Sequence, residues 1–340
     1  MKVAMYYSNH DVRLEEMPKP GIGKGEILLK VISSGICGSD IMEWYRIKKA
    51  PLVLGHEVAG EVAEIGDGVS GFKKGDRVVV THHVPCGECH YCRDGNETMC
   101  ETLRTTKFYP GGFAEYIRVP AVNVQKGTLH LPDNVSYDEG TFVEPLGCVV
   151  RSHRKADIRK NHTVLVLGSG LSGLLHIKLA KAAGCARVIA TDVSESRRQA
   201  AEKAGADLVL DAADDVPAKV KEFNSGRLAD RVIVCAGVMP AFRQALDSVD
   251  RGGRLLFFAP LRPGEELPVP VEHIWKNGIS IVTSYAAAKD DLEEALMLLS
   301  SGSVTVSDMI THRLPLKKAG EGFRLFADGK SLKVIIKPHQ

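Results

Sequence analysis

One segment constrains the fold of this chain more than any other: an apolar run that ends in a glycine-rich turn. The run 164–167 leads into the pattern G-x-G-x-x-G, formed by Gly168, Ser169, Gly170, Leu171, Ser172 and Gly173. In a strand–turn–helix unit the first glycine makes the tight turn, the second lets the backbone approach a pyrophosphate, and the third lets the helix pack on the strand. Glycines alone would also suit a purely structural turn. The amphipathic run 174–183 and the acid Asp192 at the end of the next apolar run favour a dinucleotide site, with the phosphates at the positive end of a helix.

Asp192 indicates which dinucleotide is bound. A carboxylate at the end of the second strand accepts hydrogen bonds from the ribose hydroxyls and repels a 2′-phosphate, which favours NAD over NADP. Arg197 and Arg198 follow in the next helix. Their side chains either hold a 2′-phosphate or are simply exposed to solvent. We therefore expect NAD, with Arg197 among the residues near the cofactor.

Composition excludes several classes of protein. The chain has 340 residues, of which 44% are hydrophobic and 25% charged, and this is enough for two cores. A net charge of +2, with acids and bases interspersed, predicts no nucleic-acid or membrane partner. No signal peptide and no apolar run of the ~18 residues of a membrane span is evident. We expect a cytoplasmic protein whose eight cysteines are thiols or metal ligands rather than disulfides.

The order of expected elements predicts an α/β protein with two domains. Up to about residue 120, short strands alternate with Gly and Pro clusters: 2–6, 26–34, 57–65, 77–80 and 113–119. From 161 to 284, apolar strands alternate with helical patterns, which predicts a parallel, doubly wound sheet: 164–167, 188–191, 208–210, 231–235, 255–258 and 279–283. A helix over 290–300 and a strand over 333–337 leave that pattern and are expected to return to the first domain. The predicted domains are therefore 1–152, completed by 286–340, and 153–285.

A helix is expected to lead out of the first domain. Ser136 and Glu139 form a capping box, and an apolar periodicity continues to Val150. Pro145 is expected to bend this helix beside Glu144, because proline cannot donate the usual backbone hydrogen bond.

Four cysteines predict a structural zinc site. Cys86, Cys89, Cys92 and Cys100 lie within one short loop, so all four sulfurs can converge tetrahedrally on one ion. Two disulfides, the alternative, do not suit a reducing compartment. Because four thiolates leave no coordination position open, we expect this metal to stabilise the loop rather than take part in chemistry.

Two further motifs in the first domain carry candidate ligands. They are Cys37-Gly38-Ser39-Asp40 and Gly55-His56-Glu57, and Glu144 lies on the helix that leaves the domain. Singly, each residue has an ordinary structural explanation. Taken in order with the cysteine loop and the glycine turn, they resemble the zinc-containing alcohol dehydrogenases of the medium-chain dehydrogenase/reductase superfamily over essentially the whole chain. The Glu-Pro-Leu pattern at 144–146 is most similar to the sorbitol (L-iditol) and threonine dehydrogenase branch.

The resemblance implies a GroES-like, mostly β catalytic domain, a Rossmann NAD-binding domain, and two Zn²⁺ per chain. Cys37 and His56 would be ligands of a catalytic zinc, and either Glu144 or Glu57 would supply the third group, directly or through water. Three protein ligands leave a fourth position for substrate oxygen, where zinc lowers the pKa of an alcohol so that hydride can pass to NAD. Ser39 is then the expected first proton carrier, with a turn-forming role as the alternative. Asp40 is expected to hydrogen-bond His56 and fix its tautomer.

The chain also departs from that branch. Many polyol and threonine dehydrogenases have a histidine two residues after the motif's aspartate, where this chain has Met42, and the segment 40–55 is shorter than in those relatives. Trp44 and Tyr45 could line the substrate pocket. Lys48 and Lys49 either attract an acidic or phosphorylated substrate or solvate a loop.

The sequence thus predicts an NAD-dependent zinc dehydrogenase that converts a secondary alcohol or polyol to a ketone. The alternatives are an L-threonine 3-dehydrogenase-like oxidation of an amino alcohol, and a nucleotide-binding redox sensor without catalysis. Relatives assemble through the edge strands of their Rossmann sheets, so a homodimer or homotetramer is expected, with 279–283 apolar enough to be such an edge.

Overall fold

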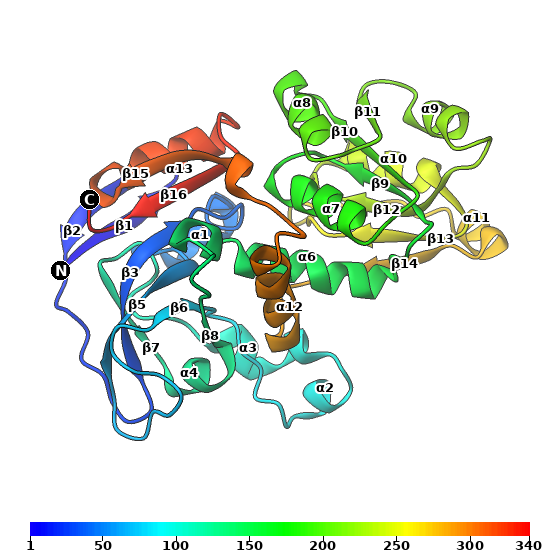
Figure 1. Cartoon of the computed structure of the whole chain (residues 1–340). Helices are drawn as coiled ribbons and strands as arrows, with labels where there is room; N and C mark the ends of the chain where they lie inside the picture. Colours follow the sequence, from blue (N-terminus) through cyan, green and yellow to red (C-terminus); the bar gives the residue numbers. More distant parts are fainter. The chain divides into compact units, whose positions relative to one another are not determined.

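The computed structural model describes all residues 1–340, and these form two units that are described here separately (Figure 1). The first comprises Met1–Gly147 and Ala286–Gln340, and the second comprises Cys148–Tyr285. The expected boundary at 152 lies inside helix α6 (Val143–Ala156), a few residues beyond the observed one. No helix is both long and apolar enough to cross a lipid bilayer.

The first unit is built on β-sheets, as the GroES-like prediction required. A seven-stranded sheet has the order β15-β16-β3-β5-β6-β8 with β7 also paired to β3, and a three-stranded sheet has the order β2-β1-β4. Its core is mostly aliphatic and also contains Phe113 and Phe323, which are both fully buried and pack edge to face. The strands are β1 (Lys2–Ser8), β2 (Asp11–Glu16), β3 (Ile27–Gly35), β4 (Leu52–Val53), β5 (Glu57–Ile65), β6 (Arg77–Val80), β7 (Tyr116–Val119), β8 (Thr128–His130), β15 (Ile310–Pro315) and β16 (Lys333–Lys337).

Short helices connect these strands, and two longer ones complete the unit. They are α1 (Glu43–Arg46), α2 (His90–Arg93), α3 (Glu101–Thr105), α4 (Ala121–Gly127), α5 (Tyr137–Gly140), α12 (Lys289–Ser300) and α13 (Ala319–Ala327), with 3₁₀ turns η1 (Ile47–Lys49), η2 (Glu97–Met99), η3 (Ser307–Met309) and η4 (Leu316–Lys318). Strand β16 pairs antiparallel with β3 and parallel with β15. The C-terminal segment therefore returns to the first unit, as expected.

The second unit contains a six-stranded parallel sheet with the order β11-β10-β9-β12-β13-β14. This is the Rossmann strand order, so the predicted fold class is confirmed. Strand β9 is buried at every residue, which fits a central parallel strand whose two faces are both covered. The strands are β9 (Thr163–Leu167), β10 (Arg187–Asp192), β11 (Leu208–Asp211), β12 (Ala229–Val234), β13 (Val249–Phe257) and β14 (Ser280–Thr283), and the helices are α7 (Leu171–Ala182), α8 (Glu195–Lys203), α9 (Val216–Phe223), α10 (Met239–Ser248) and α11 (Val271–Asn277).

The prediction of a single helix after Ser136 is wrong in one respect. The capping box of Ser136 and Glu139 is present, but it begins the one-turn helix α5, which ends at Gly140, and α6 starts separately at Val143. Pro145 therefore lies in the first turn of α6 rather than at a bend. A backbone N–H has no intrahelical partner there, so proline costs little.

Candidate functional site

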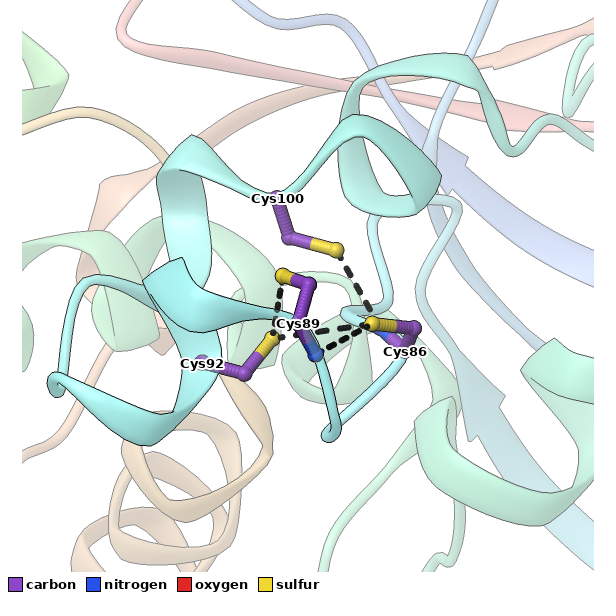
Figure 2. A group of neighbouring side chains, drawn as sticks. All are labelled: Cys86, Cys89, Cys92 and Cys100. Carbon is purple, nitrogen blue, oxygen red and sulfur yellow. Dashed lines mark hydrogen bonds between the residues drawn. The ribbon is translucent and has the colours of Figure 1, made fainter.

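The four cysteines converge at one place in the first unit (Figure 2). The Sγ atoms of Cys89 and Cys92 are 3.5 Å apart, and those of Cys86 and Cys92 are 3.9 Å apart. Four sulfurs at the Zn–S distance of about 2.3 Å in a tetrahedron would lie ~3.8 Å from one another. All four thiols are free, so the loop contains no disulfide, and its geometry fits a closed Zn²⁺ site.

Backbone N–H groups stabilise the thiolate form of some of these cysteines. The backbone N–H groups of Glu88 and Cys89 donate to Cys86 Sγ and lower the pKa of that thiol. Burial raises the pKa of Cys100, but backbone hydrogen bonds, led by that from Cys86, lower it to about 6. Burial raises the pKa of Cys92 to about 12. Thiolates this close repel one another, and a bound cation would offset that repulsion.

A second group of donors forms where strands β3 and β5 pair. Gly35, the last residue of β3, lies opposite Glu57, the first of β5, in the antiparallel register. Cys37 follows β3 and His56 precedes β5, so the pairing brings the two motifs together although they are separated in sequence. One ligand atom from each of Cys37, His56 and Glu57 lies within 4.8 Å of the others. Thiolate, imidazole and carboxylate are together a suitable donor set for zinc with a position left open.

Asp40 is the charged partner of His56 in this group. Its Oδ1 lies 3.4 Å from His56 Nδ1, and its Oδ2 accepts a hydrogen bond of 3.1 Å from the Cys37 backbone N–H. Burial opposes ionisation of Asp40, but His56, Arg46 and the Cys37 backbone N–H together outweigh it and lower the pKa of the carboxyl. Burial likewise disfavours the imidazolium, yet Asp40 and Cys37 raise the pKa of His56. An anion on Nδ1 leaves Nε2 as the nitrogen available to a metal.

Glu57 is fully buried and forms an ion pair with the fully buried Lys333 of β16. The Lys333 ammonium also lies 5.1 Å from the centre of the Phe142 ring. Only Oε2 of Glu57 contacts the lysine, and the buried Oε1 has no hydrogen-bond partner. A buried carboxylate oxygen without a partner is costly, and a metal ion is one group that would satisfy it.

Glu144 lies outside this three-residue group. It borders a small cavity with Thr81, Gly140 and apolar side chains that include Val58 and Leu292. The structure thus brings together Cys37, His56 and Glu57, and it does not include Glu144 among them.

Three residues of the site were not singled out from the sequence. Arg46 donates from Nε to the Ser39 carbonyl at 2.9 Å and from Nη2 to the Ser39 hydroxyl at 3.1 Å. Lys333 pairs with Glu57, and the His82 ring centre lies 4.7 Å from that of His56. Lys333 lies far along the chain from its partner, so no local sequence pattern indicates the pair. His82 and His83, shortly after an apolar strand, were the one sequence signal that could have indicated a site residue.

The glycine-rich turn of the second unit connects β9 to α7. Gly168 has a φ of +95°, and a Cβ at Gly173 would overlap the Gly168 carbonyl oxygen, so both positions require glycine. Gly170 precedes the first residue of α7, and a Cβ built on it would meet nothing nearer than the Arg197 guanidinium at 3.9 Å. Leu171 and Ser172 are the first two residues of α7. The positive end of this helix therefore opens onto space that suits a phosphate.

Asp192 ends strand β10 beside this turn and is buried. It accepts hydrogen bonds from the backbone N–H groups of Ser169 at 2.8 Å and Ser194 at 2.9 Å. Arg198 is paired with Asp211 at 2.8 Å and also donates to backbone carbonyls, so its charge is already engaged. Of the two arginines, Arg197 is the one that lies over the glycine turn.

Comparison with known proteins gives matches to both units. Residues 23–133 match the family model described as the alcohol dehydrogenase GroES-like domain, and 173–301 match that described as zinc-binding dehydrogenase. The sorbitol dehydrogenase of Bacillus subtilis is 31% identical over 352 residues, covering 100% of this chain and 98% of its own.

Two solved structures that resemble the chain are described with a bound nicotinamide cofactor. A putative zinc-binding dehydrogenase from Sinorhizobium meliloti bound to NADP has a TM-score of 0.89 and 28% identity, with 99% of both chains covered. An alcohol dehydrogenase from E. coli complexed with NADH has a TM-score of 0.88 and 26% identity, again with 99% of both chains covered.

Proposed function

We propose that this chain removes hydride from a secondary alcohol carbon and passes it to NAD. It belongs to the zinc-containing alcohol dehydrogenases of the medium-chain dehydrogenase/reductase superfamily and is a zinc-dependent oxidoreductase of alcohols or polyols. The product is a ketone, and the reaction is reversible. The observation that carries the proposal is the buried group of Cys37, His56 and Glu57, a donor set that leaves a metal position open to substrate.

Cys37, His56 and Glu57 hold the catalytic zinc in this proposal, and the four-cysteine loop holds a second, structural zinc. Glu57 is preferred to Glu144 because its Oε1 lacks a partner and it belongs to the compact group. When bound, zinc supplies a Lewis acid that lowers the pKa of the substrate hydroxyl. Asp40 orients His56 and keeps Nε2 directed at the metal.

Ser39 moves the proton. Its hydroxyl accepts one hydrogen bond from Arg46, which leaves one lone pair and its own hydrogen for other partners. A group that accepts a proton on one side and donates one on the other is what a relay to solvent needs. Arg46 positions this hydroxyl, and the ion pair of Arg46 with Asp40, at 3.7 Å, couples the relay to the metal ligands.

The cofactor choice rests on Asp192. A carboxylate at the end of β10, with Arg198 engaged by Asp211, favours the free ribose hydroxyls of NAD over a 2′-phosphate. Gly168, Gly170 and Gly173 let the pyrophosphate approach the start of α7. The neighbouring structures bind NADP in one case and NADH in the other, so the preference has to be read from this chain's own residues.

Asp192→Asn tests the cofactor choice, because asparagine still accepts a backbone hydrogen bond but has no charge. We expect the ratio of kcat/KM with NAD to that with NADP to fall by at least about tenfold. The matched control is Asp215→Asn, which removes a charge at the cap of α9, where asparagine can still accept the hydrogen bond of the Ala218 backbone N–H. An unchanged ratio in Asp192→Asn would remove the basis for NAD.

We also propose a cytoplasmic homodimer or homotetramer. All eight cysteines are free thiols, which suits a reducing compartment. Strand β14 lies at the edge of its sheet, with Ile281 36% exposed, and Trp275 on the preceding helix is 81% exposed. An apolar edge of this kind favours pairing with a second copy.

A further inference from the structure

Positive charge gathers beside the group of Cys37, His56 and Glu57. Arg46, on α1, is held against the Cys37–Asp40 motif by its two hydrogen bonds to Ser39. Its guanidinium carbon also lies 4.9 Å from the centre of the Tyr45 ring. This cation is therefore fixed next to the metal ligands rather than free in solvent.

Lys49 and Lys107 extend this charge. The Lys49 ammonium lies 4.1 Å from the centre of the Tyr45 ring, and neither lysine forms an ion pair with a carboxylate. Hydrogen bonding to Lys49, with further contributions from Arg46 and Lys107, lowers the pKa of the Tyr45 phenol. The three charged groups that act most strongly on this ring are thus all cations.

His82 joins these cations to the metal ligands. Its ring centre lies 4.7 Å from that of His56 and 3.6 Å from that of His83. Arg46 and Lys107 are also among the charges that act on it. Its Nδ1 is buried and has no hydrogen-bond partner, which is a cost that a ligand oxygen would relieve.

The nearby carboxylates do not pair with Lys49 or Lys107. Asp40 is shared between His56 and Arg46, and Glu43 accepts a hydrogen bond from the Asn9 backbone N–H. The charges of Lys49 and Lys107 are left for an external anion. A neutral polyol could accept hydrogen bonds from these lysines, but it carries no charge to pair with theirs.

We propose that Arg46, Lys49 and Lys107, together with His82, form an anion subsite, so that the substrate is a polyol bearing a carboxylate or a phosphate monoester. This inference rests on the proposed polyol oxidation and specifies its substrate class. The anion lies on the cations while the reacting hydroxyl lies at the metal. Binding energy from the charged end then positions the hydroxyl for reaction.

The test compares three probes of similar length: a neutral hexitol, a hexonate and a hexitol phosphate. For the wild type we expect kcat/KM to be at least about tenfold higher with one of the two anions than with the hexitol, and to fall as salt is added. The variant Lys49→Gln/Lys107→Gln should bring the ratio of anionic to neutral kcat/KM close to one. Lys48→Gln, an exposed lysine of the same segment, is the matched control and should keep the wild-type ratio.

Calorimetric binding of the hexonate and the hexitol phosphate provides a readout besides activity. Weaker binding of one anion to the double variant than to Lys48→Gln supports the subsite, and the anion concerned identifies carboxylate or phosphate. Equal binding to both variants, or a wild type that prefers the neutral hexitol, overturns the inference. If none of the probes is oxidised but anion binding still depends on the two lysines, the proposed oxidation fails and the subsite stands.

Discussion

Glu57 meets two demands at the residue scale. One of its oxygens neutralises the buried Lys333, and the other is unpartnered beside Cys37 and His56. A carboxylate with a single partner would be an expensive choice for a buried position unless the second oxygen also had a role. In the proposed function, this second oxygen of Glu57 binds the metal.

The variant Glu57→Gln should lower the metal content from about two zinc ions per chain to about one, whereas Glu144→Gln should retain two. Measurement of bound zinc by atomic emission, after dialysis, gives both values. Glu57→Gln also leaves Lys333 charged and buried, which is expected to cost about 3–5 kcal/mol.

The double variant Glu57→Gln/Lys333→Met separates these two effects. It removes the stranded charge, so we expect stability to recover while the zinc content stays near one. Retention of two zinc ions by the double variant, or loss of one by Glu144→Gln, would assign the third ligand to Glu144 instead.

At the scale of elements, Asp138 joins helix α5 to three strands. Its carboxylate accepts hydrogen bonds of 2.7 Å from each of Ser33 on β3, Arg313 on β15 and Lys337 on β16. Burial raises the pKa of Asp138, but these partners, Lys337 foremost, lower it overall. The group thus secures the C-terminal strands to the strand that precedes Cys37.

The sign of the pH dependence follows from that lowered pKa. The stabilisation is present above the unfolded value of about 4 and is lost as the pH falls through the folded value. Asp138→Asn should therefore reduce the free energy of unfolding near neutral pH by about 2 kcal/mol, and the difference from wild type should shrink toward pH ~3.

Urea unfolding at several pH values measures this difference. Asp133→Asn is the control, because the Asp133 side chain is fully exposed and should matter little at any pH. A difference between wild type and Asp138→Asn that stays constant down to pH ~3 would show that the charge of Asp138 does not secure these strands.

At the scale of the molecule, the edge strand β14 is the expected site of assembly. Ile281→Lys places a charge on that edge, so the particle mass in solution should fall by at least half. Sedimentation measures the mass. Leu14→Lys, at an exposed leucine of β2 in the first unit, should assemble as wild type does, and an unchanged mass for Ile281→Lys would exclude this edge.

Much of the molecule was predictable because its strongest signals are local. Strand β5 and strand β16 were predicted residue for residue, and alternating apolar runs and helical patterns predicted the parallel, doubly wound sheet of the second unit. The strand β2 was missed, since its residues are mostly charged and half-exposed at a sheet edge.

The site was predicted only in part, because some of its contacts join residues that are distant in sequence. The motifs at Cys37 and His56 are short and local, but the Glu57–Lys333 pair joins residues 276 positions apart and arises only when β16 returns to β3. Arg46 follows the motif it supports, yet nothing in the neighbouring sequence distinguishes it from the exposed lysines Lys48 and Lys49. The hydrogen bonds of Arg46 to Ser39 depend on how α1 turns back toward the motif, and side-chain packing determines that turn.

The most direct test of the proposed oxidation is the rate of NADH formation by zinc-replete protein given a panel of polyols. We expect steady turnover of at least one secondary alcohol of this class. We also expect loss of that turnover in Cys37→Ser, which should keep about one zinc in the four-cysteine loop. Absence of turnover with every alcohol tested, in protein that holds both zinc ions, or full activity in Cys37→Ser, would contradict the proposed oxidation.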